Sequence, residues 1–323
     1  MKKFAQYTGL ALLLLIAAAM PSMASETGTF DRTLQVSGPV DLDLRTGSGT
    51  IRIHAGADGS VHVSATIRAG DSWFGMSARE KVKKIQSNPP ISQTGNIVSI
   101  GRIEDSDLRN DVSIDYDLTV PAQTHLKSTS GSGNQTISGI KQSVSVSSGS
   151  GTLYIDNAGA DVRATTGSGS IKINSAKGPV EAMAGSGEIH AIGVGGDIKV
   201  HTGSGDIEIE QSTPGNVEAH AGSGHLRLHS VKGRVSARTG SGGIEADGEP
   251  QGQWNLGAGS GGVELRFPAQ SSFNLDAESR SGYVTVNRQV SDGTSTRKHV
   301  QGKVGNGGPL VEIRTGSGHI QVN

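Results

Sequence analysis

The tripeptide Gly-Ser-Gly recurs along this chain at an almost constant interval. It begins at positions 131, 149, 167, 185, 203, 222, 240 and 259, so successive copies are 18 or 19 residues apart, and outlying copies begin at 47 and 316. A fixed period of this length indicates a repeat fold, in which each repeat is one structural unit. The regularity excludes a Gly-rich flexible linker, whose glycines keep no such period.

Two short segments of alternating apolar residues lie within each period. One follows Gly-Ser-Gly, as in Ile207 and Ile209, and the other precedes it, as in Val162 and Ala164. Alternation with a period of two places one face inward and the other outward, as in a β-strand. The sequence therefore predicts an all-β parallel β-solenoid, or β-helix, with coils of about 18 residues, two short strands per coil and a short helical insert near the N-terminus.

A narrow interior between two walls of strands fits the composition. Aromatic residues make up only 3% of the chain, whereas it contains 48 glycines. We expect Ile and Leu on one wall and Val and Ala on the facing wall. We also expect the glycines to occupy the corners, for two reasons: a sharp corner requires positive φ, and stacked corners leave no space for a Cβ atom.

The outward positions form columns in which charges of opposite sign tend to alternate from coil to coil. Opposite charges on adjacent strands favour in-register stacking by about 0.2–1 kcal/mol per pair, although a mixed-charge surface can produce such a pattern by coincidence. The columns are Lys172, His190, Glu208, Arg227 and Glu245; Glu210, His229, Asp247 and Arg266; and Arg163, Glu181, Lys199 and Glu218.

Residues 1–24 are typical of a secretory signal peptide, with Lys2 and Lys3 before the apolar run Leu10–Met20 and a small-residue cleavage site at Ser22 to Ala24. An uncleaved membrane anchor is the alternative. We expect an exported protein with no transmembrane segment after cleavage. The chain has no cysteine, which excludes disulfides, thiolate metal sites and a lipid-modified cysteine.

The rest of the chain divides into three parts by sequence pattern. Residues 25–120 begin the solenoid and contain a helical insert at 70–111, residues 121–286 form the regular solenoid, and residues 287–323 form a polar loop and a C-terminal coil. Within the insert, the segment from Ser77 to Ser87 predicts an amphipathic helix that ends before Pro89. Such a helix is suited to cover the open end of the solenoid.

The order of these motifs resembles a known family. A strand containing Tyr116 closes on Val120-Pro121, Thr-Ser-Gly-Ser-Gly follows at 129–133, and units such as 178–189 and 196–209 repeat after it. This arrangement, from about Thr33 to Val322, is similar to the putative-adhesin family of bacterial envelope proteins, known as domain of unknown function 4097. The resemblance implies a single-chain β-solenoid and supplies no catalytic residues, and the family's adhesin label is itself an analogy.

The sequence predicts no metal site and no cofactor. Calcium-binding β-rolls need an Asp at a fixed place in every half-turn, but here Gly-Ser-Gly is followed by Asp only at Asp206. His201 and His220 occupy equivalent outward places on adjacent coils, where two imidazoles can bind a transition metal. No third ligand is evident for this pair, so we interpret both residues as solvated surface histidines.

The sequence also predicts no catalytic residues. The enzymatic alternative is a carbohydrate-cleaving β-helix that uses carboxylate pairs as acid and base, with candidates Glu208, Glu245 and Glu264. These residues lie in the alternating charge columns, where charge pairing accounts for them. The Gly-rich corners are not phosphate loops, because they precede strands and lack the Lys-Ser/Thr ending.

A threonine often precedes Gly-Ser-Gly, which at first resembles an ice-binding array. The column is interrupted by alanine, so a regular match to a lattice is not expected. The threonines are Thr46, Thr166, Thr202, Thr239 and Thr315, and the alanines are Ala184, Ala221 and Ala258.

The predicted function is therefore non-catalytic. A net charge of −1 gives no electrostatic case for nucleic-acid binding. We expect an exported cell-envelope protein, periplasmic or secreted to the cell surface, that presents a rigid surface to an unknown protein or polysaccharide partner, as an adhesin does. The alternatives are a periplasmic structural or envelope-stress-related partner protein and a carbohydrate-active β-helix enzyme.

Overall fold

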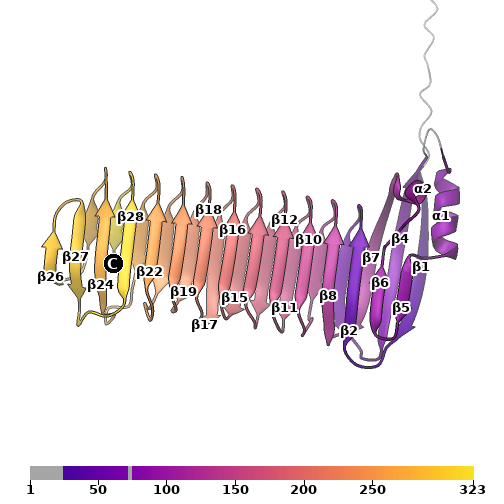
Figure 1. The fold of residues 1–323 in the computed structure, drawn as a ribbon, viewed down its shortest axis with the longest axis horizontal. Helices are drawn as coiled ribbons and strands as arrows, with labels where there is room; N and C mark the ends of the chain where they lie inside the picture. The colour runs from indigo at the N-terminus through magenta and orange to yellow at the C-terminus, as the bar shows by residue number, and fades with distance from the viewer. Residues whose placement is uncertain (1–24, 72–74) are drawn as a thin grey trace, which may run out of the picture.

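A computed structural model describes residues 25–71 and 75–323 of the chain. The predicted signal peptide at residues 1–24 lies outside the described residues. Within them, two long sheets of 14 and 15 strands face each other along an extended axis (Figure 1). We call the 14-stranded sheet, which contains β11, sheet A, and the 15-stranded sheet, which contains β10, sheet B. No helix in the described ranges is both long and apolar enough to cross a membrane.

The predicted coils form the regular middle of the protein, and the parallel β-solenoid is confirmed. Each coil contributes one strand to each sheet, and each strand pairs in parallel with the equivalent strands of the neighbouring coils. In sheet A these strands are β9 (Gln135–Ser138), β11 (Leu153–Ala158), β13 (Ile171–Ala176), β15 (Ile189–Gly195), β17 (Ile207–Thr213), β19 (Leu226–Val231), β21 (Ile244–Gly248) and β23 (Val263–Arg266). In sheet B they are β8 (Thr124–Ser130), β10 (Val144–Ser148), β12 (Val162–Thr166), β14 (Val180–Ala184), β16 (Ile198–Thr202), β18 (Val217–Ala221), β20 (Val235–Thr239) and β22 (Trp254–Ala258).

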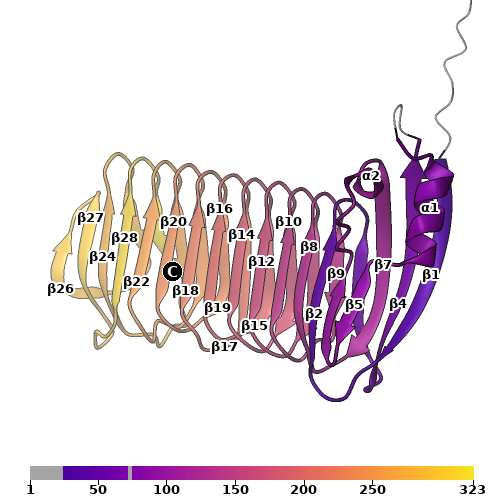
Figure 2. The ribbon, with the colours of Figure 1, turned by 45° about the vertical axis from the view of Figure 1, so that its right-hand side comes forward.

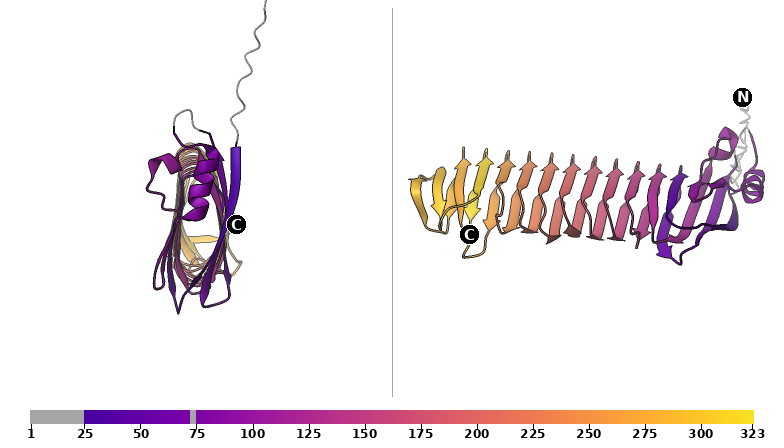
Figure 3. Two further views of the ribbon diagram at one scale, coloured as in Figure 1. Left: turned by 90° about the vertical axis from the view of Figure 1, so that its right-hand side faces the viewer. Right: turned by 60° about the horizontal axis from the view of Figure 1, so that its bottom comes forward.

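The two sheets lie close together, as the view along the axis in Figure 3 (left) shows, and buried apolar side chains form a thin layer between them. Ile207 and Ile209 are fully buried on sheet A, and Val162 and Ala164 are buried on the facing sheet B. The predicted division into an Ile/Leu wall and a Val/Ala wall is confirmed. Because small residues line one wall, the two sheets approach closely and leave little room for aromatic side chains.

The N-terminal end is closed by antiparallel strands and a helix (Figure 2). β2 and β3 form a coil that stacks on β8 and β9, and β6 and β7 stack on its other side. β4 then pairs antiparallel with β7, and β1 with β4. These elements are β1 (Ser25–Gln35), β2 (Val40–Thr46), β3 (Ile51–Gly56), β4 (Ser60–Gly70), α1 (Ala78–Ser87), β5 (Ile91–Thr94), β6 (Ile97–Ile100), α2 (Ser106–Arg109) and β7 (Val112–Pro121).

The predicted helix is confirmed as α1, which packs against β1 and β4. Ser77 is its N-cap and forms a capping box with Glu80, which satisfies backbone groups at the start of the helix. Val82 and Ile85 are buried against the strands. Gly28 of β1 allows this contact, because a Cβ atom there would collide with the side chain of Val82.

The C-terminal end, predicted as a polar loop and a coil at 287–323, contains additional strands ahead of the last coil. Part of that segment forms two strands, β26 and β27, of which β27 pairs antiparallel with β24. The last coil, β28 and β29, then lies between the β22/β23 coil and the β24/β25 coil (Figure 1). Because β27 occupies the outer edge of β24, β28 pairs with the inner edge. The strands are β24 (Phe273–Ser279), β25 (Val284–Val286), β26 (Val290–Ser295), β27 (His299–Val304), β28 (Leu310–Thr315) and β29 (Ile320–Val322).

The Gly-Ser-Gly corners need glycine because successive coils approach closely. A Cβ atom on Gly149 would overlap the carbonyl oxygen of Gly131 in the preceding coil, and one on Gly151 would overlap that of Gly133. Positive φ was the other predicted reason for glycine at the corners. It is wrong for Gly131, Gly133, Gly149 and Gly151, because none of them has φ in the left-handed region. Positive φ occurs instead where sheet A strands end, at Gly139, Asn157, Ser175, Gly193, Ser230 and Gly248.

The corner explanation predicts a difference between two glycines at the same place in the motif. Gly149→Ala should destabilise the protein by about 1–3 kcal/mol, because the new methyl group overlaps backbone. Gly47→Ala is the matched control, since a Cβ there meets nothing within 4 Å, and it should change stability by less than about 0.5 kcal/mol. Thermal unfolding followed by circular dichroism measures both variants, and equal losses would refute the explanation.

Candidate functional site

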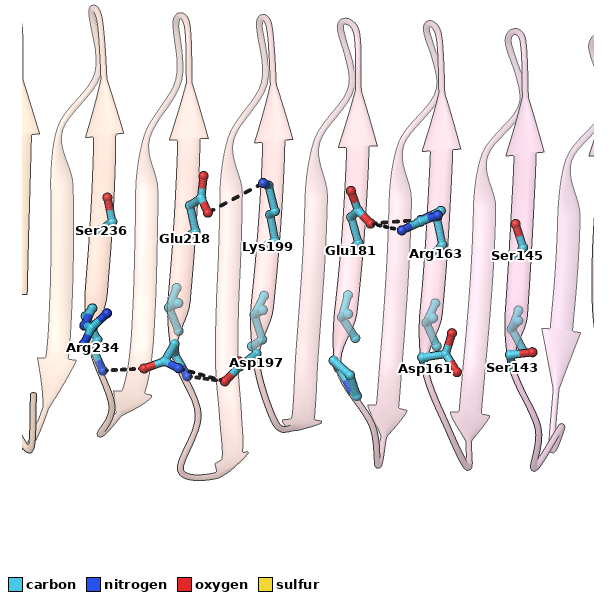
Figure 4. A pocket seen from close by; sticks show the side chains of 17 residues that line it. Ser143, Ser145, Asp161, Arg163, Glu181, Asp197, Lys199, Glu218, Arg234 and Ser236 are labelled. Carbon is cyan, nitrogen blue, oxygen red and sulfur yellow. Dashed lines mark hydrogen bonds and ion pairs between the residues drawn. The ribbon is translucent and has the colours of Figure 1, made fainter.

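The outer faces of both sheets carry the predicted charge columns in register. On sheet B, Arg163 pairs with Glu181 at 2.6 Å (Nη2 to Oε2) and Lys199 with Glu218 at 3.7 Å (Nζ to Oε2). Figure 4 shows both pairs. On sheet A, the Nδ1 atom of His190 lies 3.0 Å from an Oε2 atom of Glu208. The in-register interpretation is confirmed, although such exposed pairs contribute only about 0–1 kcal/mol each.

The column on sheet A departs from alternation at two places. Lys172 lies opposite His190, so two basic residues are adjacent. Glu245 lies opposite Glu264 on the neighbouring strand, so two carboxylates are adjacent. Glu264 accepts a hydrogen bond from Arg266 at 2.7 Å on its own strand, and Glu245 has Arg227 opposite it on the other side. Both carboxylates therefore have a basic residue beside them, and so does Glu208, which lies opposite Arg227.

A groove of about 780 Å³ runs along the outer face of sheet B, from β10 to β20 (Figure 4). Two rows of outward side chains wall it, and the backbone of the inward residues forms its floor. One row is Ser145, Arg163, Glu181, Lys199, Glu218 and Ser236, and the other is Ser143, Asp161, Pro179, Asp197, Asn216 and Arg234. Each of six successive coils thus contributes the same two outward positions to the groove.

The second row of the groove is tied to the backbone of neighbouring coils. Asp197 accepts a hydrogen bond from the backbone N–H of Asn216 at 2.8 Å, and Asn216 accepts one from that of Arg234 at 3.2 Å. Sequence analysis did not single out these residues. Their sequence signal is the place of each residue immediately before a strand at the repeat interval, which lies outside the alternating positions within strands.

Asp206, the Asp that follows Gly-Ser-Gly, has the same structural role on the opposite sheet. Its Oδ1 atom accepts a hydrogen bond from the backbone N–H of His225 at 2.9 Å, and its other oxygen lies 3.4 Å from Arg227. Both carboxylate oxygens are thus engaged by the protein. This carboxylate links coils, which gives a physical reason for an isolated Asp at this position.

His201 and His220 are neighbours in register on β16 and β18. Their ring centroids lie 6.4 Å apart, with the rings tilted by 40°. Partial burial lowers the pKa of His220, Arg238 lowers it further, and Glu218 acts in the opposite direction. Among residues 25–71 and 75–323, no group of three or more His, Asp or Glu side chains is arranged to hold a metal ion.

The threonines before Gly-Ser-Gly are not part of the outer surface. Thr166 is 2% exposed; its hydroxyl donates to the carbonyl of Gly151 at 3.1 Å and accepts from the N–H of Gly169 at 3.1 Å. Ser148 occupies the same place in the preceding coil and accepts from the N–H of Gly151. The Ser/Thr column therefore closes the corners and links successive coils, which gives a physical reason against an ice-binding role.

Comparison with known proteins supports the resemblance found in the sequence. Residues 193–323 match the model of the family described as Toastrack DUF4097. The match covers this C-terminal part, whereas the motif order extends the resemblance to about Thr33. The chain has no match among curated proteins.

Three solved structures are similar over nearly the whole chain. A putative cell adhesion protein from Clostridium sporogenes is 11% identical, with 92% of this chain and 99% of that chain covered and a TM-score of 0.23. A putative adhesin from Bacteroides fragilis is 12% identical, with 92% and 97% covered and a TM-score of 0.33. A putative adhesin from Parabacteroides merdae is 8% identical, with 91% and 96% covered and a TM-score of 0.32. These similarities identify no functional residue of this chain.

The corner role of the hydroxyl column predicts unequal effects for two adjacent threonines. Thr166→Val removes a buried hydroxyl that satisfies one carbonyl and one N–H, so it should cost about 1–3 kcal/mol. Thr165 points outward from the same strand and makes no such bond, so Thr165→Val should change stability by less than about 0.5 kcal/mol. Urea unfolding distinguishes them, and an equal effect of the two substitutions would contradict the assigned role.

Proposed function

We propose that this protein, whose residues 193–323 match the Toastrack DUF4097 family, is a non-catalytic exported protein of the bacterial envelope that binds a surface polymer. Its working element is the groove on sheet B, and its role is adhesion or attachment. The observation that supports this proposal is the continuity of the groove across six strands of one uninterrupted sheet.

Rigidity favours binding at this surface. Each strand from β10 to β20 is paired on both sides with a neighbouring coil, so the groove walls are held by a continuous hydrogen-bonded sheet. A surface that is already ordered loses little conformational entropy when a partner binds. An extended solenoid face of this type is well suited to a long partner.

The chemistry of the groove favours a polysaccharide over a folded protein. Its lining contains hydroxyl, carboxylate, amide and cationic groups but no aromatic side chain, and its two arginines are exposed. Protein interfaces are instead usually centred on buried Trp, Tyr or Arg anchors. Along the wall from Ser145 to Ser236, a polar or charged side chain recurs once per coil, at the strand spacing of about 4.8 Å. A linear chain of sugars presents hydroxyl groups repeatedly along its length, so it can meet these groups in successive coils.

The periplasmic alternative uses the same surface in a different place. A periplasmic structural or envelope-stress-related partner protein would have the same rigid face and would meet its partner inside the outer membrane. Export is common to both versions, and location distinguishes them.

Blocking the groove tests the proposal. Asp161 lines the groove, and Asp161→Trp places a bulky ring in it. Asp156→Trp is the matched control, because it makes the same change on the outer face of sheet A. Affinity electrophoresis through gels containing dextran or polygalacturonate measures binding. The proposal predicts that at least one polymer retards the wild type and the Asp156 variant but not the Asp161 variant.

Two results would contradict the proposal. Either no polysaccharide retards the wild-type protein, or both tryptophan variants bind as the wild type does. Circular dichroism of each variant checks that the coils remain folded.

A further inference from the structure

A second hollow, of about 370 Å³, lies on sheet B beyond the C-terminal end of the groove. Its centre is Gly257 on β22, which is flanked in register by Arg238 on β20 and Arg314 on β28. A Cβ atom on Gly257 would meet only the Cγ atom of Arg238, at 3.7 Å. The glycine therefore leaves a one-strand gap between two arginine side chains.

One of the arginines around this gap is fixed by carboxylates. Arg314 forms two hydrogen bonds with the carboxylate of Asp276, from Nη1 at 2.9 Å and from Nη2 at 2.7 Å. It also lies 3.6 Å from Glu278 and 3.4 Å from Glu312. The guanidinium of Arg314 holds the pKa of Asp276 below its usual value. The acidic side chains nearby are thus directed toward Arg314.

Two further arginines of the hollow are not held by carboxylates of the described residues. Arg238 and Arg280 both line the hollow and are exposed, and their guanidinium groups form no ion pair or hydrogen bond with the described residues. Lys298 adds a further positive charge at the same corner, where its Nζ donates to the backbone carbonyl of Arg280 at 2.9 Å. The hollow therefore carries cationic groups whose hydrogen-bond donors are available to a ligand.

The hollow lies to one side of the C-terminal end of the groove. Ser236 is the last member of one groove wall, and Arg238 follows it by two residues on the same outward face of β20. Two residues along a strand span about 6.6 Å. Because the groove crosses the strands, this step leads sideways from the groove wall, and a carboxylate carried by a sugar beside Ser236 can point toward Arg238.

We propose that this hollow binds the carboxylate group of an acidic polysaccharide whose chain lies in the sheet B groove. The inference rests on the proposed function and specifies its ligand class as a polymer of uronic acids. Guanidinium groups suit this ligand because their planar fork donates two parallel hydrogen bonds to a carboxylate. The gap over Gly257 admits the carboxylate beside Arg238, while Arg314 stays with its own acidic partners and Arg280 adds positive charge from the far side of the same hollow.

Isothermal titration calorimetry with two forms of one polymer tests the inference. Polygalacturonate carries a carboxylate on each sugar, and its methyl ester has the same backbone without the charge. The wild-type protein should bind the acid about tenfold more tightly than the ester, which corresponds to one gained charge-assisted interaction. This preference should decrease as salt is added, because exposed charges are screened.

Three variants locate the effect. Arg238→Ala combined with Arg280→Ala should abolish the preference for the acid, and Gly257→Leu should abolish it by filling the gap without changing charge. Arg45→Ala removes an exposed arginine of sheet B that lies outside the groove and the hollow and is already paired with Asp43, so it should keep the preference within about twofold. Circular dichroism confirms that each variant is folded.

The outcomes separate this inference from the proposed function. If acid and ester bind equally, and Asp161→Trp weakens both, the groove function stands and the carboxylate site is refuted. If neither polymer binds, both proposals fail. Tighter binding of dextran sulfate than of polygalacturonate would also overturn the assignment to a carboxylate, as would an equal loss from Arg45→Ala and from the double variant.

Discussion

The close approach of successive coils at the Gly-Ser-Gly corner is the constraint on which the rest of this structure depends. The backbone carbonyl of one corner lies where the next corner would carry a Cβ atom, as at Gly131 and Gly149. A buried hydroxyl, such as that of Thr166, then links the two coils by donating to one and accepting within its own. These contacts hold equivalent residues in line along the axis, so both the apolar interior and the outer charge columns are consequences of the corner.

The same alignment produces the candidate site. Because each coil repeats the last in register, single outward positions become continuous rows, and two such rows wall the groove from β10 to β20. A glycine in a row becomes a gap, as Gly257 does between Arg238 and Arg314. Substitutions at outward positions can therefore change what such a surface binds without changing how the coils stack.

Much of this fold could be predicted from the sequence, because its contacts repeat at a fixed interval. The inward positions, the helix capped by Ser77 and the pairing of Arg163 with Glu181 all follow from local pattern and period. The two ends could not be predicted in the same way. β28 lies between β22 and β24 because β27 covers the outer edge of β24, and pairing over such a distance leaves no periodic signal. The arginine hollow was missed for the same reason, since β28 supplies Arg314 to it.

The central claim is that the sheet B face works outside the cell, and labelling of a single thiol tests it most directly. The chain has no cysteine, so Ser145→Cys places one reactive group in the groove. Ser128→Cys, at a position 1% exposed, is the control for labelling of unfolded protein. We predict that a membrane-impermeant maleimide labels the Ser145 variant on intact cells, while a periplasmic marker thiol stays unlabelled. Labelling of that variant only after the outer membrane is opened would contradict the adhesion account and favour a periplasmic partner.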